Sequence, residues 1–516
     1  MKRIICILAT LAFSAGVYAQ TADDAIMLSQ EYYEGTARTM AMGNAFTAIG
    51  GDLGAIAANP ASSGVYTYSQ FAFTPSVTIT PYSSTYIGSN LNGSNSKMTF
   101  SNAGFITSFD TGGKTGLLNF NFGVVYNKKR TFNSYLCATG QTDESSMLAS
   151  IGSSLYGIHS PDLEFKDGYN PYYNSSAPWR GILAWNTYGL STFKNIDEKR
   201  FPDVDDEYVA ATENFDPETK EAFVADYLAQ NFSRSTYGGI QEFAFNFGCN
   251  ISDILYLGLN LNLEAVNYSE SQTYSESAFN PSAFQDGFVN MSQTYWRQTT
   301  GSGFSTKIGA ILTPVSGLRI GATFTTPTWY SLKDSWYYDM EVSFNNGKRY
   351  VESSPTGIYN YKLTAPLRFS VGMAYTFGRF GMISAEYERV SYNAAQLKDV
   401  NGNITTFAAE NAYIQSAYGS SNIFRIGGEV WAGRIALRGG YDRFSKAAID
   451  DSAVSFWSCG LGFKLTQRSA IDVAFQRWNM GERNFTLYDG YFGLDAPVGT
   501  ARNKVNKVAL TFSFKF

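Results

Sequence analysis

The feature that most restricts the fold of this sequence is a series of segments in which apolar residues alternate with small or polar ones. In residues 255–264 leucine occupies every second position, and similar alternation occurs in residues 118–124 and 318–324. A period of two residues is typical of a β-strand with one apolar face, because successive side chains of a strand point to opposite sides. The chain is therefore predicted to consist mainly of such strands.

The connections between these segments alternate strictly between short and long. The short ones are residues 110–116, 252–253, 316, 378, 432–433 and 467–468, and the long polar ones are residues 81–97, 130–238, 269–303, 329–360, 392–422, 444–452 and 479–503. Outer-membrane barrels have this arrangement, with short periplasmic turns and long extracellular loops. Such a sheet must also close on itself, because an open edge would leave backbone groups unpaired in hydrocarbon.

The predicted fold class is therefore all-β, a transmembrane antiparallel β-barrel of about fourteen strands over residues 68–516, with both ends of the barrel on the periplasmic side. The long third connection, residues 130–238, is predicted to be an extracellular insertion. It is expected to contain a helix over residues 216–231, where Asp216 could cap the helix and Pro217 begin it. Pro75 and Pro366 lie in strand-like segments, so each implies a bulge or a strand end.

The composition agrees with a membrane barrel and argues against some other classes. Aromatic residues make up 16% of the chain, with 35 Tyr and 39 Phe, which suits strands that place aromatic side chains at lipid interfaces. No segment beyond the amino terminus approaches the ~20 consecutive apolar residues of a spanning helix. The near balance of 39 basic and 44 acidic residues gives no reason to expect nucleic-acid binding.

The two ends of the chain carry targeting signals. Lys2 and Arg3 precede a short apolar run, and residues 17–19 fit a cleavage site, so residues 1–19 are predicted to be a signal peptide. The last strand ends in Phe516 and resembles the signal by which the barrel assembly machinery recognises its substrates. The predicted location is therefore the cell outer membrane, with outer-membrane lipid and lipopolysaccharide as partners of the barrel.

Residues 20–67 do not have the pattern of a barrel strand. They are rich in small residues, which allow close backbone packing, and Asn59-Pro60 favours a turn. A barrel of this girth has an interior that must be filled if it is not to leak. The segment is therefore predicted to be an N-terminal plug folded into the lumen.

Several short motifs resemble the FadL family of outer-membrane transporters of long-chain fatty acids and hydrocarbons. The resemblance is strongest to the N-terminal hatch of that family, and it extends to residues 318–322, 326–328, 365–368 and 425–429. The hatch-like residues are Gly43, Asn44, Asp52, Asn59, Pro60 and Ala61. The resemblance implies a fourteen-stranded channel that captures an apolar substrate in the lumen and releases it sideways, through a strand interruption beside the hatch.

Four arginines on the predicted inward face are candidates for binding a substrate carboxylate, because a guanidinium group matches a carboxylate in geometry and charge. They are Arg319, Arg368, Arg425 and Arg438. The alternative is a set of structural ion pairs, and this alternative is favoured for any single arginine. The acidic residues available for such ion pairs on the same predicted face are Glu264, Glu386, Glu429 and Asp472.

Several other residues could have a functional role but are also open to an ordinary structural interpretation. Aromatic residues in or beside the outer loops either gather an apolar ligand or form an interfacial girdle; they are Trp296, Trp329, Tyr330 and Trp336. The acidic run at residues 203–207 lacks the spacing of a calcium loop and is expected to be solvated surface. His159 is the only histidine, and no nucleophile motif or metal-ligand pair accompanies it. No enzymatic activity, metal or cofactor is predicted.

The predicted function is passive import of hydrophobic small molecules by a monomer, with long-chain fatty acids as the first candidates. The alternative is a surface-binding or adhesion barrel whose insertion engages a partner and whose lumen stays shut. An aqueous porin is disfavoured by the plug.

Overall fold

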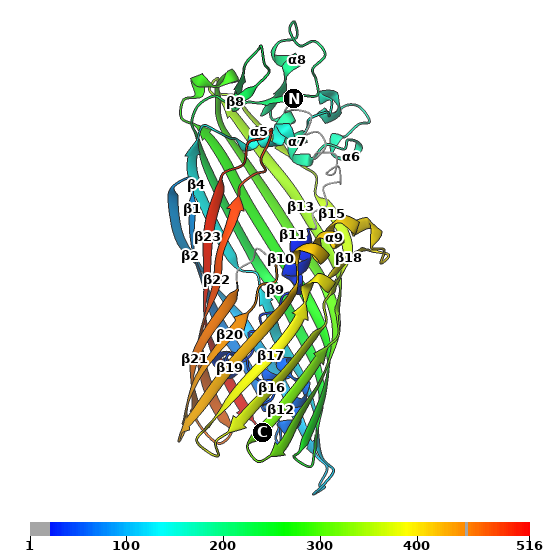
Figure 1. The fold of residues 1–516 in the computed structure, drawn as a ribbon, viewed down its shortest axis with the longest axis vertical. Coiled ribbons are helices and arrows are strands. Elements are labelled where there is room, and N and C mark those ends of the chain that lie inside the picture. The colour runs from blue at the N-terminus through cyan, green and yellow to red at the C-terminus, as the bar shows by residue number, and fades with distance from the viewer. Residues whose placement is uncertain (1–20, 449–452) are drawn as a thin grey trace.

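The structure, a computed structural model, describes residues 21–448 and 453–516. The predicted signal peptide, residues 1–19, lies outside the described residues. Strands run from tight turns at one end of the molecule to a domain of short helices at the other (Figure 1). None of the helices in the described part of the chain is long and apolar enough to cross a membrane.

The strands of the barrel wall follow one another around a closed sheet. They are β1 (Gln70–Tyr86), β2 (Ser89–Asp110), β3 (Leu117–Thr131), β4 (Ser134–Thr142), β9 (Leu228–Ile251), β10 (Leu255–Ala278), β11 (Phe288–Val315), β12 (Leu318–Thr325), β13 (Thr328–Phe344), β15 (Gly357–Ala365), β16 (Arg368–Thr376), β17 (Gly381–Ser391), β19 (Ser420–Ala432), β20 (Ile435–Phe444), β21 (Val454–Lys464), β22 (Ser469–Thr486) and β23 (Val498–Lys515). Each is antiparallel to the next, and β23 closes the barrel by pairing with β1. Because β3 with β4, β12 with β13, and β15 with β16 each share one place in the wall, the barrel has fourteen strand positions. The predicted fold class and strand number are confirmed.

The half of the barrel nearest the tight turns has an apolar outer surface. On β10, for example, Leu257, Leu261 and Leu263 are exposed, whereas Asn260 and Asn262 are buried in the lumen. This outward band of large apolar side chains is the part of the wall that faces lipid. At the end of this half the backbone N–H of Phe516 donates to the carbonyl of Ser69 at 3.0 Å, so the barrel begins and ends at the same rim.

The predicted bounds of several outer loops are wrong, because the strands continue beyond the lipid-facing band. Residues 81–97 form the end of a β1–β2 hairpin with a turn at residues 87–88, and most of residues 269–303 and 479–503 is strand. Above the membrane neither face of a strand touches lipid, so the apolar alternation that marks the strand in the sequence disappears. A prediction from alternation alone therefore places the ends of these strands too early.

Two proline breaks interrupt neighbouring strands at the same height. Pro366 separates β15 from β16, and Pro327 separates β12 from β13, while the flanking pairs Thr325↔Arg368 and Thr328↔Ala365 keep the register. Neither proline has an N–H to donate across the gap. The strand end predicted at Pro366 is thus confirmed, and the bulge predicted at Pro75 is confirmed by a register shift between β1 and β2.

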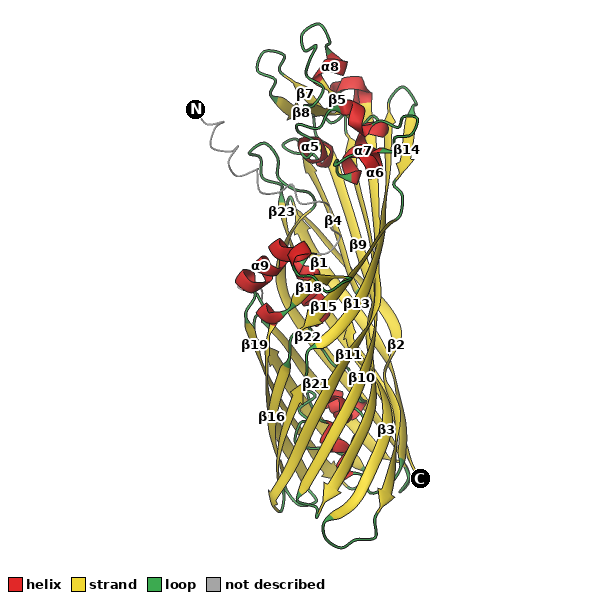
Figure 2. Ribbon diagram, turned by 90° about the vertical axis from the view of Figure 1, so that its right-hand side faces the viewer, coloured by secondary structure: helices red, strands yellow, loops and turns green. Residues whose placement is uncertain are grey.

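Residues 143–227 form an outer domain at the end of the barrel opposite the tight turns (Figures 1 and 2). Its elements are α5 (Met147–Ser153), η3 (Ser160–Leu163), α6 (Pro171–Asn174), α7 (Trp179–Asn186), β5 (Leu190–Thr192), α8 (Phe193–Ile196), β6 (Tyr208–Ala210), β7 (Glu213–Phe215) and β8 (Ala222–Val224). The helix predicted over residues 216–231 is wrong. The Asp216 carboxylate accepts from the N–H of Glu218 at 2.7 Å in a turn between β7 and β8, so the capping signature serves a turn instead.

The segment before β1 lies inside the barrel, where its helices are visible between the strands of Figure 2. It contains α2 (Ala22–Ser29), α3 (Ala37–Ala41), α4 (Ala55–Ala58) and η2 (Pro60–Val65). Many of its small residues are fully buried, which confirms a plug in the lumen. The remaining outer elements are β14 (Arg349–Ser353), β18 (Gln396–Asp399), η4 (Pro281–Ala283), η5 (Gln285–Gly287), η6 (Tyr392–Ala394), η7 (Thr405–Phe407) and α9 (Ala408–Ala417).

Candidate functional site

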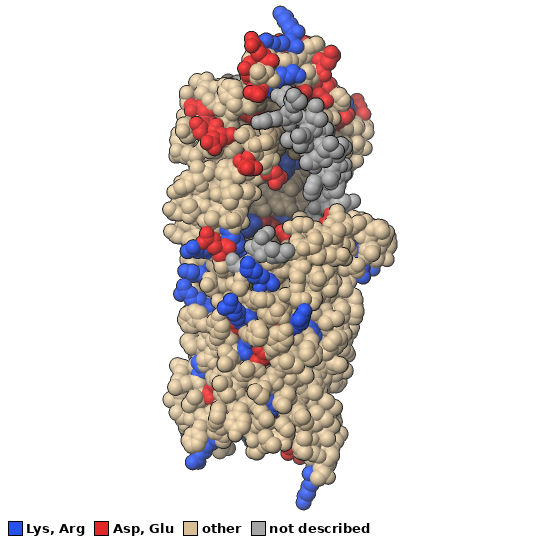
Figure 3. Space-filling view, viewed as in Figure 1, with Lys and Arg blue, Asp and Glu red and all other residues tan. Residues whose placement is uncertain are grey.

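A large cavity occupies the outer half of the lumen. It encloses about 1150 Å³ between the plug helix α2 and the extended strands, and Figure 3 shows the surface hollowed between the outer domain and α9. Its aromatic lining includes Tyr32, Phe132, Phe232, Tyr268, Tyr274, Tyr295, Trp336, Tyr338, Trp478 and Phe485, and its arginines are Arg130, Arg180, Arg234, Arg297 and Arg483. The cavity therefore offers apolar rings together with guanidinium groups, of which Arg297 is paired with Asp24 and Glu270 of the same lining.

Tyr32 of the plug forms the floor of this cavity. It lines both the outer cavity and a second, inner cavity of about 50 Å³ that lies deeper in the lumen. Its ring packs against Phe444, Phe456 and Trp478 at centroid distances of 5.1, 5.6 and 5.8 Å. The Arg130 guanidinium lies 5.1 Å from the centre of the same ring. Tyr32 is thus the side chain that separates the two cavities, and no motif in the sequence singles it out.

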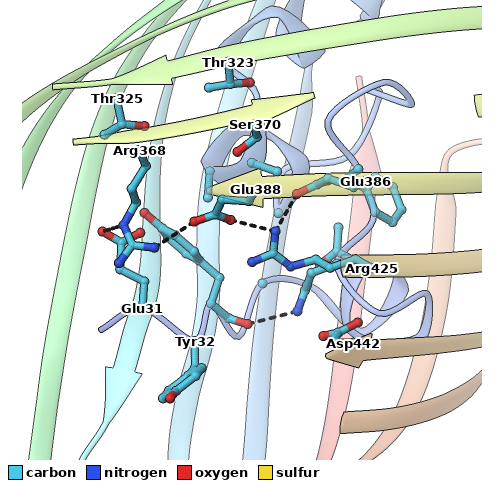
Figure 4. A pocket seen from close by; sticks show the side chains of 18 of the residues that line it. Glu31, Tyr32, Thr323, Thr325, Arg368, Ser370, Glu386, Glu388, Arg425 and Asp442 are labelled. Atoms are coloured by element: carbon cyan, nitrogen blue, oxygen red, sulfur yellow. Dashed lines mark hydrogen bonds and ion pairs between the residues drawn. The ribbon is translucent and has the colours of Figure 1, made fainter. Parts of the chain in front are cut away.

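The inner cavity is enclosed by alternating charges. Glu31 of the plug pairs with Arg368 at 3.0 Å, and Arg368 pairs with Glu388 at 2.7 Å. Glu388 also binds Arg425 at 2.7 Å, and Arg425 binds Glu386 at 2.6 Å (Figure 4). Glu386 in turn accepts from the backbone N–H of Thr47. The chain of ion pairs begins on the plug at Glu31 and returns to it through the hydrogen bond from Thr47, so it fastens the plug to the wall.

The predicted arginines thus lie where inward-facing side chains were expected, and each of them donates to a partner. Arg438 pairs with Glu429 and Asp472 at 2.7 and 2.6 Å, and Arg38 of the plug shares Glu429 at 2.8 Å. Arg319 donates to the carbonyl of Ile49, also in the plug. Of the predicted acidic partners, Glu386, Glu429 and Asp472 bind these arginines, whereas Glu264 pairs with Lys129.

Asn59 and Pro60, the centre of the hatch-like motif, form a turn against β11 and β12. The Asn59 side chain accepts from the N–H of Ala61 at 2.9 Å and donates to the carbonyls of Thr47 and Ala310 at 2.7 and 3.1 Å. It therefore joins two parts of the plug to the wall. Buried Asp52 accepts from the Thr36 hydroxyl and the N–H of Gly54 at 2.7 and 2.9 Å.

Gly43 and Asn44 also make specific contacts. Both have positive φ, 61° and 51°, which turns the chain sharply after α3. Asn44 donates to the carbonyl of Tyr33 at 3.1 Å. The two residues thereby tie the stretch that carries Tyr32 to the rest of the plug.

The wall meets the plug at glycines that the sequence interpretation did not single out. A Cβ on Gly427 would collide with the carbonyl of Met42, and one on Gly440 would collide with the backbone of Gly43. The same holds for Gly258 and Gly309 against the Asn59–Pro60 turn. Glycines at inward positions on several strands are the sequence signal for a closely docked plug.

The four aromatic residues predicted near the outer loops have different positions. Trp336 lines the outer cavity, whereas Trp329 points out of the barrel with 50% of its surface exposed. Trp296 stacks on Tyr337 at 5.4 Å, and buried Tyr330 donates to Glu264. Trp336 is therefore placed to meet a ligand in the cavity, and Trp329 is placed to meet lipid.

His159 and the acidic run at residues 203–207 lie together in the outer domain. The His159 imidazole contacts the Asp205 carboxylate at 2.6 Å, which raises the pKa of the exposed histidine. Within the described residues, no group of three or more His, Cys, Asp or Glu side chains is arranged to hold a metal ion.

Comparison with solved structures finds proteins that share this fold. A FadL homologue from Pseudomonas aeruginosa aligns with 94% of this chain and 99% of its own length, with a TM-score of 0.53 and 12% identity. The chain has the fold of that protein. The toluene transporter TodX of P. putida aligns with 93% of this chain and 98% of its own length, with a TM-score of 0.50 and 11% identity. The resemblance predicted from the sequence is thus confirmed at the level of the fold, although no family model and no curated protein matches the sequence.

Proposed function

We propose that this protein is an outer-membrane channel for the passive import of hydrophobic small molecules. The observation that carries the proposal is the outer cavity of about 1150 Å³, which is lined by many aromatic side chains and closed on the periplasmic side by a segment of the chain inside the lumen. Moving apolar surface from water into such a cavity is favourable by ~25 cal/mol per Å². The fold shared with the FadL homologue and the toluene transporter supports this proposal.

Long-chain fatty acids are the first substrate class to test, because the cavity combines aromatic rings with cations. Arg130, at the end of β3, lies over the rings of Tyr32 and Phe132 at 5.1 and 5.4 Å, and Arg234 lines the cavity from β9. A carboxylate head group would be attracted to these guanidinium groups while its chain lay on the rings. The four arginines predicted from the sequence then act differently, by holding the plug through their ion pairs.

Passage requires the plug to move, because the inner cavity of about 50 Å³ is too small for such a molecule. In our proposal the stretch around Tyr32 withdraws, with the Asn59–Pro60 turn as the fixed end. Substrate then leaves sideways at the Pro327–Pro366 break, beside which Thr325 and Arg368 line the inner cavity. This exit would deliver an apolar molecule to the membrane without exposing its chain to water.

The decisive experiment is uptake of radiolabelled oleate by cells that lack their own importer, with and without this protein. The same cells should be tested with radiolabelled toluene, and surface protein should be quantified in each case. We expect saturable uptake of at least one of the two compounds. Uptake of toluene alone would restrict the proposal to uncharged substrates. If neither compound enters cells that carry folded protein at the surface, the import proposal is wrong.

A second candidate function is surface binding by the outer domain. Residues 143–227 contain 16 acidic and 6 basic residues, a net charge of −10 against −5 for the whole chain, and Figure 3 shows acidic side chains at this end. Tyr156, Tyr173 and Tyr188 are exposed on the same domain. A folded, acidic and aromatic surface suits a cationic partner. Binding of such a partner without uptake of either compound would favour this function.

A further inference from the structure

A pocket of about 390 Å³ lies on the outside of the barrel wall, separate from the lumen. Its polar side chains come from outward positions of three adjacent strands and are Thr300 and Ser302 of β11, Ser331 and Lys333 of β13, and Asn360 and Lys362 of β15. Val400, at the end of β18, closes one side. None of the uses described above involves this pocket.

The lining suits an anion with several oxygens. Two lysines supply positive charge, and three hydroxyl groups and one amide supply neutral hydrogen-bond donors. Lys398 lies directly across from Lys362 in the β15–β18 pairing and adds a third cation at the edge. No carboxylate belongs to the lining, and nearby Asp399 accepts from the N–H groups of Asn401 and Asn403 at 2.9 and 2.8 Å. The donors match the oxygens of a phosphate group.

The height of the pocket along the barrel indicates which kind of molecule would carry this phosphate. Trp329, Phe304 and Leu367 lie just below it on the outer surface and are 50%, 40% and 49% exposed. Trp329 is eleven residues from the start of β12 at Leu318, which at ~3.3 Å per residue and a tilt of ~40° is a height of roughly 28 Å. A lipid-facing band is ~25 Å tall and ends in aromatic residues. The pocket therefore lies at the level of the outer head groups.

We propose that this outer-wall pocket binds the phosphate group of a phosphorylated lipid of the outer leaflet. The acyl chains of the lipid would lie against Trp329, Phe304 and Leu367, while Lys333 and Lys362 contact the phosphate and the hydroxyl groups complete its hydrogen bonds. Charge and apolar contact come from adjacent parts of one surface, as an amphipathic lipid requires. The inference does not depend on the transport proposal, because the pocket is outside the barrel.

The test is retention of lipid A by the purified full-length protein, measured by native mass spectrometry after titration with diphosphorylated lipid A in detergent. The variant Lys333→Gln/Lys362→Gln removes both cations and keeps polar side chains of similar length. The control Lys199→Gln/Lys348→Gln makes the same charge change at exposed positions in the outer domain and in a hairpin turn. We expect at least a fivefold loss of lipid A binding in the first variant and less than a twofold change in the control.

A second titration, with lipid A from which both phosphates have been removed, separates the head group from the chains. We expect the wild type to bind this lipid as weakly as the Lys333→Gln/Lys362→Gln variant does. Equal binding of the two lipids by the wild type would overturn the proposal, because the acyl chains alone would then account for it. Unchanged lipid A binding by the folded variant would overturn it equally. Inorganic phosphate at equal concentration should not compete, and full competition would reassign the pocket to free phosphate.

Discussion

At the scale of single residues, Tyr32 has a position unlike that of any other plug side chain. Its ring separates the outer cavity from the inner one and rests on Phe444, Phe456 and Trp478. Its hydroxyl lies 3.5 Å from the Gln30 side chain. The ring is therefore the part of Tyr32 that lies between the two cavities.

Replacing Tyr32 by alanine should join the two cavities. We expect Tyr32→Ala to raise single-channel conductance in planar bilayers severalfold above that of the wild type, because the stretch that must withdraw loses its packing against Phe444, Phe456 and Trp478. Tyr32→Phe keeps the ring and should behave as the wild type. Equal conductance of Tyr32→Ala and wild type, with both barrels folded, would show that another part of the plug closes the lumen.

The inward glycines give a prediction about how the plug is held. Gly427→Ala and Gly440→Ala place a methyl group against Met42 and Gly43, and overpacking of this kind costs about 1–3 kcal/mol. Gly428 and Gly439 are adjacent residues on the same strands, and the nearest atoms to their added methyl groups lie at 3.6 and 4.0 Å. We expect faster proteolysis of the N-terminal segment in the first two variants. Protection equal to that of Gly428→Ala and Gly439→Ala would argue against close docking at these glycines.

At the scale of elements, the sequence predicts best where lipid enforces alternation. The tight turns, the fourteen strands and the plug followed from period, connection length and small residues. The strand extensions above the membrane were missed because both of their faces are away from lipid, and the turn at Asp216 was mistaken for a helix start because aspartate caps both structures. Strand parity is enough to predict the inward arginines, whereas the position of Tyr32 depends on two cavities that meet at its ring, which no sequence pattern encodes.

The paired proline breaks are the elements that we assign to lateral exit. Continuing the register places Thr326 opposite Leu367, both at outward positions beside the break. A disulfide in Thr326→Cys/Leu367→Cys should abolish uptake of the imported compound under oxidising conditions, and a reductant should restore it. Ile320→Cys/Met373→Cys joins the same two strand positions below the break, at a pair of the same type, and should leave uptake unchanged. Full uptake through the cross-linked Thr326→Cys/Leu367→Cys protein would exclude this exit.

At the scale of the whole molecule, the outer domain is joined to the barrel by a shared core. Leu148, Ile182 and Leu183 of the domain belong to one buried cluster with Tyr274 and Met340 of the strands. Beside this cluster the N–H of Met147 donates to Glu276 of β10 at 2.7 Å. The domain is therefore fixed to the end of the barrel, and changes in its stability should be felt at the mouth of the outer cavity.

Glu213 makes the stability of the outer domain, where it joins the barrel, depend on pH. Burial raises the pKa of Glu213 from its ordinary value of 4.5 to about 7, and nearby Glu276 adds to the shift. The folded domain therefore keeps a proton that the unfolded chain releases above pH 4.5, so this stabilisation is complete below pH 4.5 and is lost as the pH rises through 7. The free energy of folding that is lost in this way is of order 3 kcal/mol. The protection factors of the backbone amides in residues 143–227, which are corrected for the intrinsic rise of amide exchange with pH, should fall over this range, while those of the membrane-spanning strands should not change.

The variant Glu213→Gln keeps an oxygen to accept from the N–H of Ala210, which the wild-type carboxylate binds at 2.9 Å, but it cannot ionise. We expect the protection factors of its outer domain at pH 8 to equal those of the wild-type domain at pH 5. His159 provides the contrast: it is exposed, so His159→Gln should leave the pH profile of the domain in place. A wild-type profile that persists in Glu213→Gln would mean that another group controls the joint. Loss of the profile would identify one buried carboxyl as the point where external pH acts on the mouth of the outer cavity.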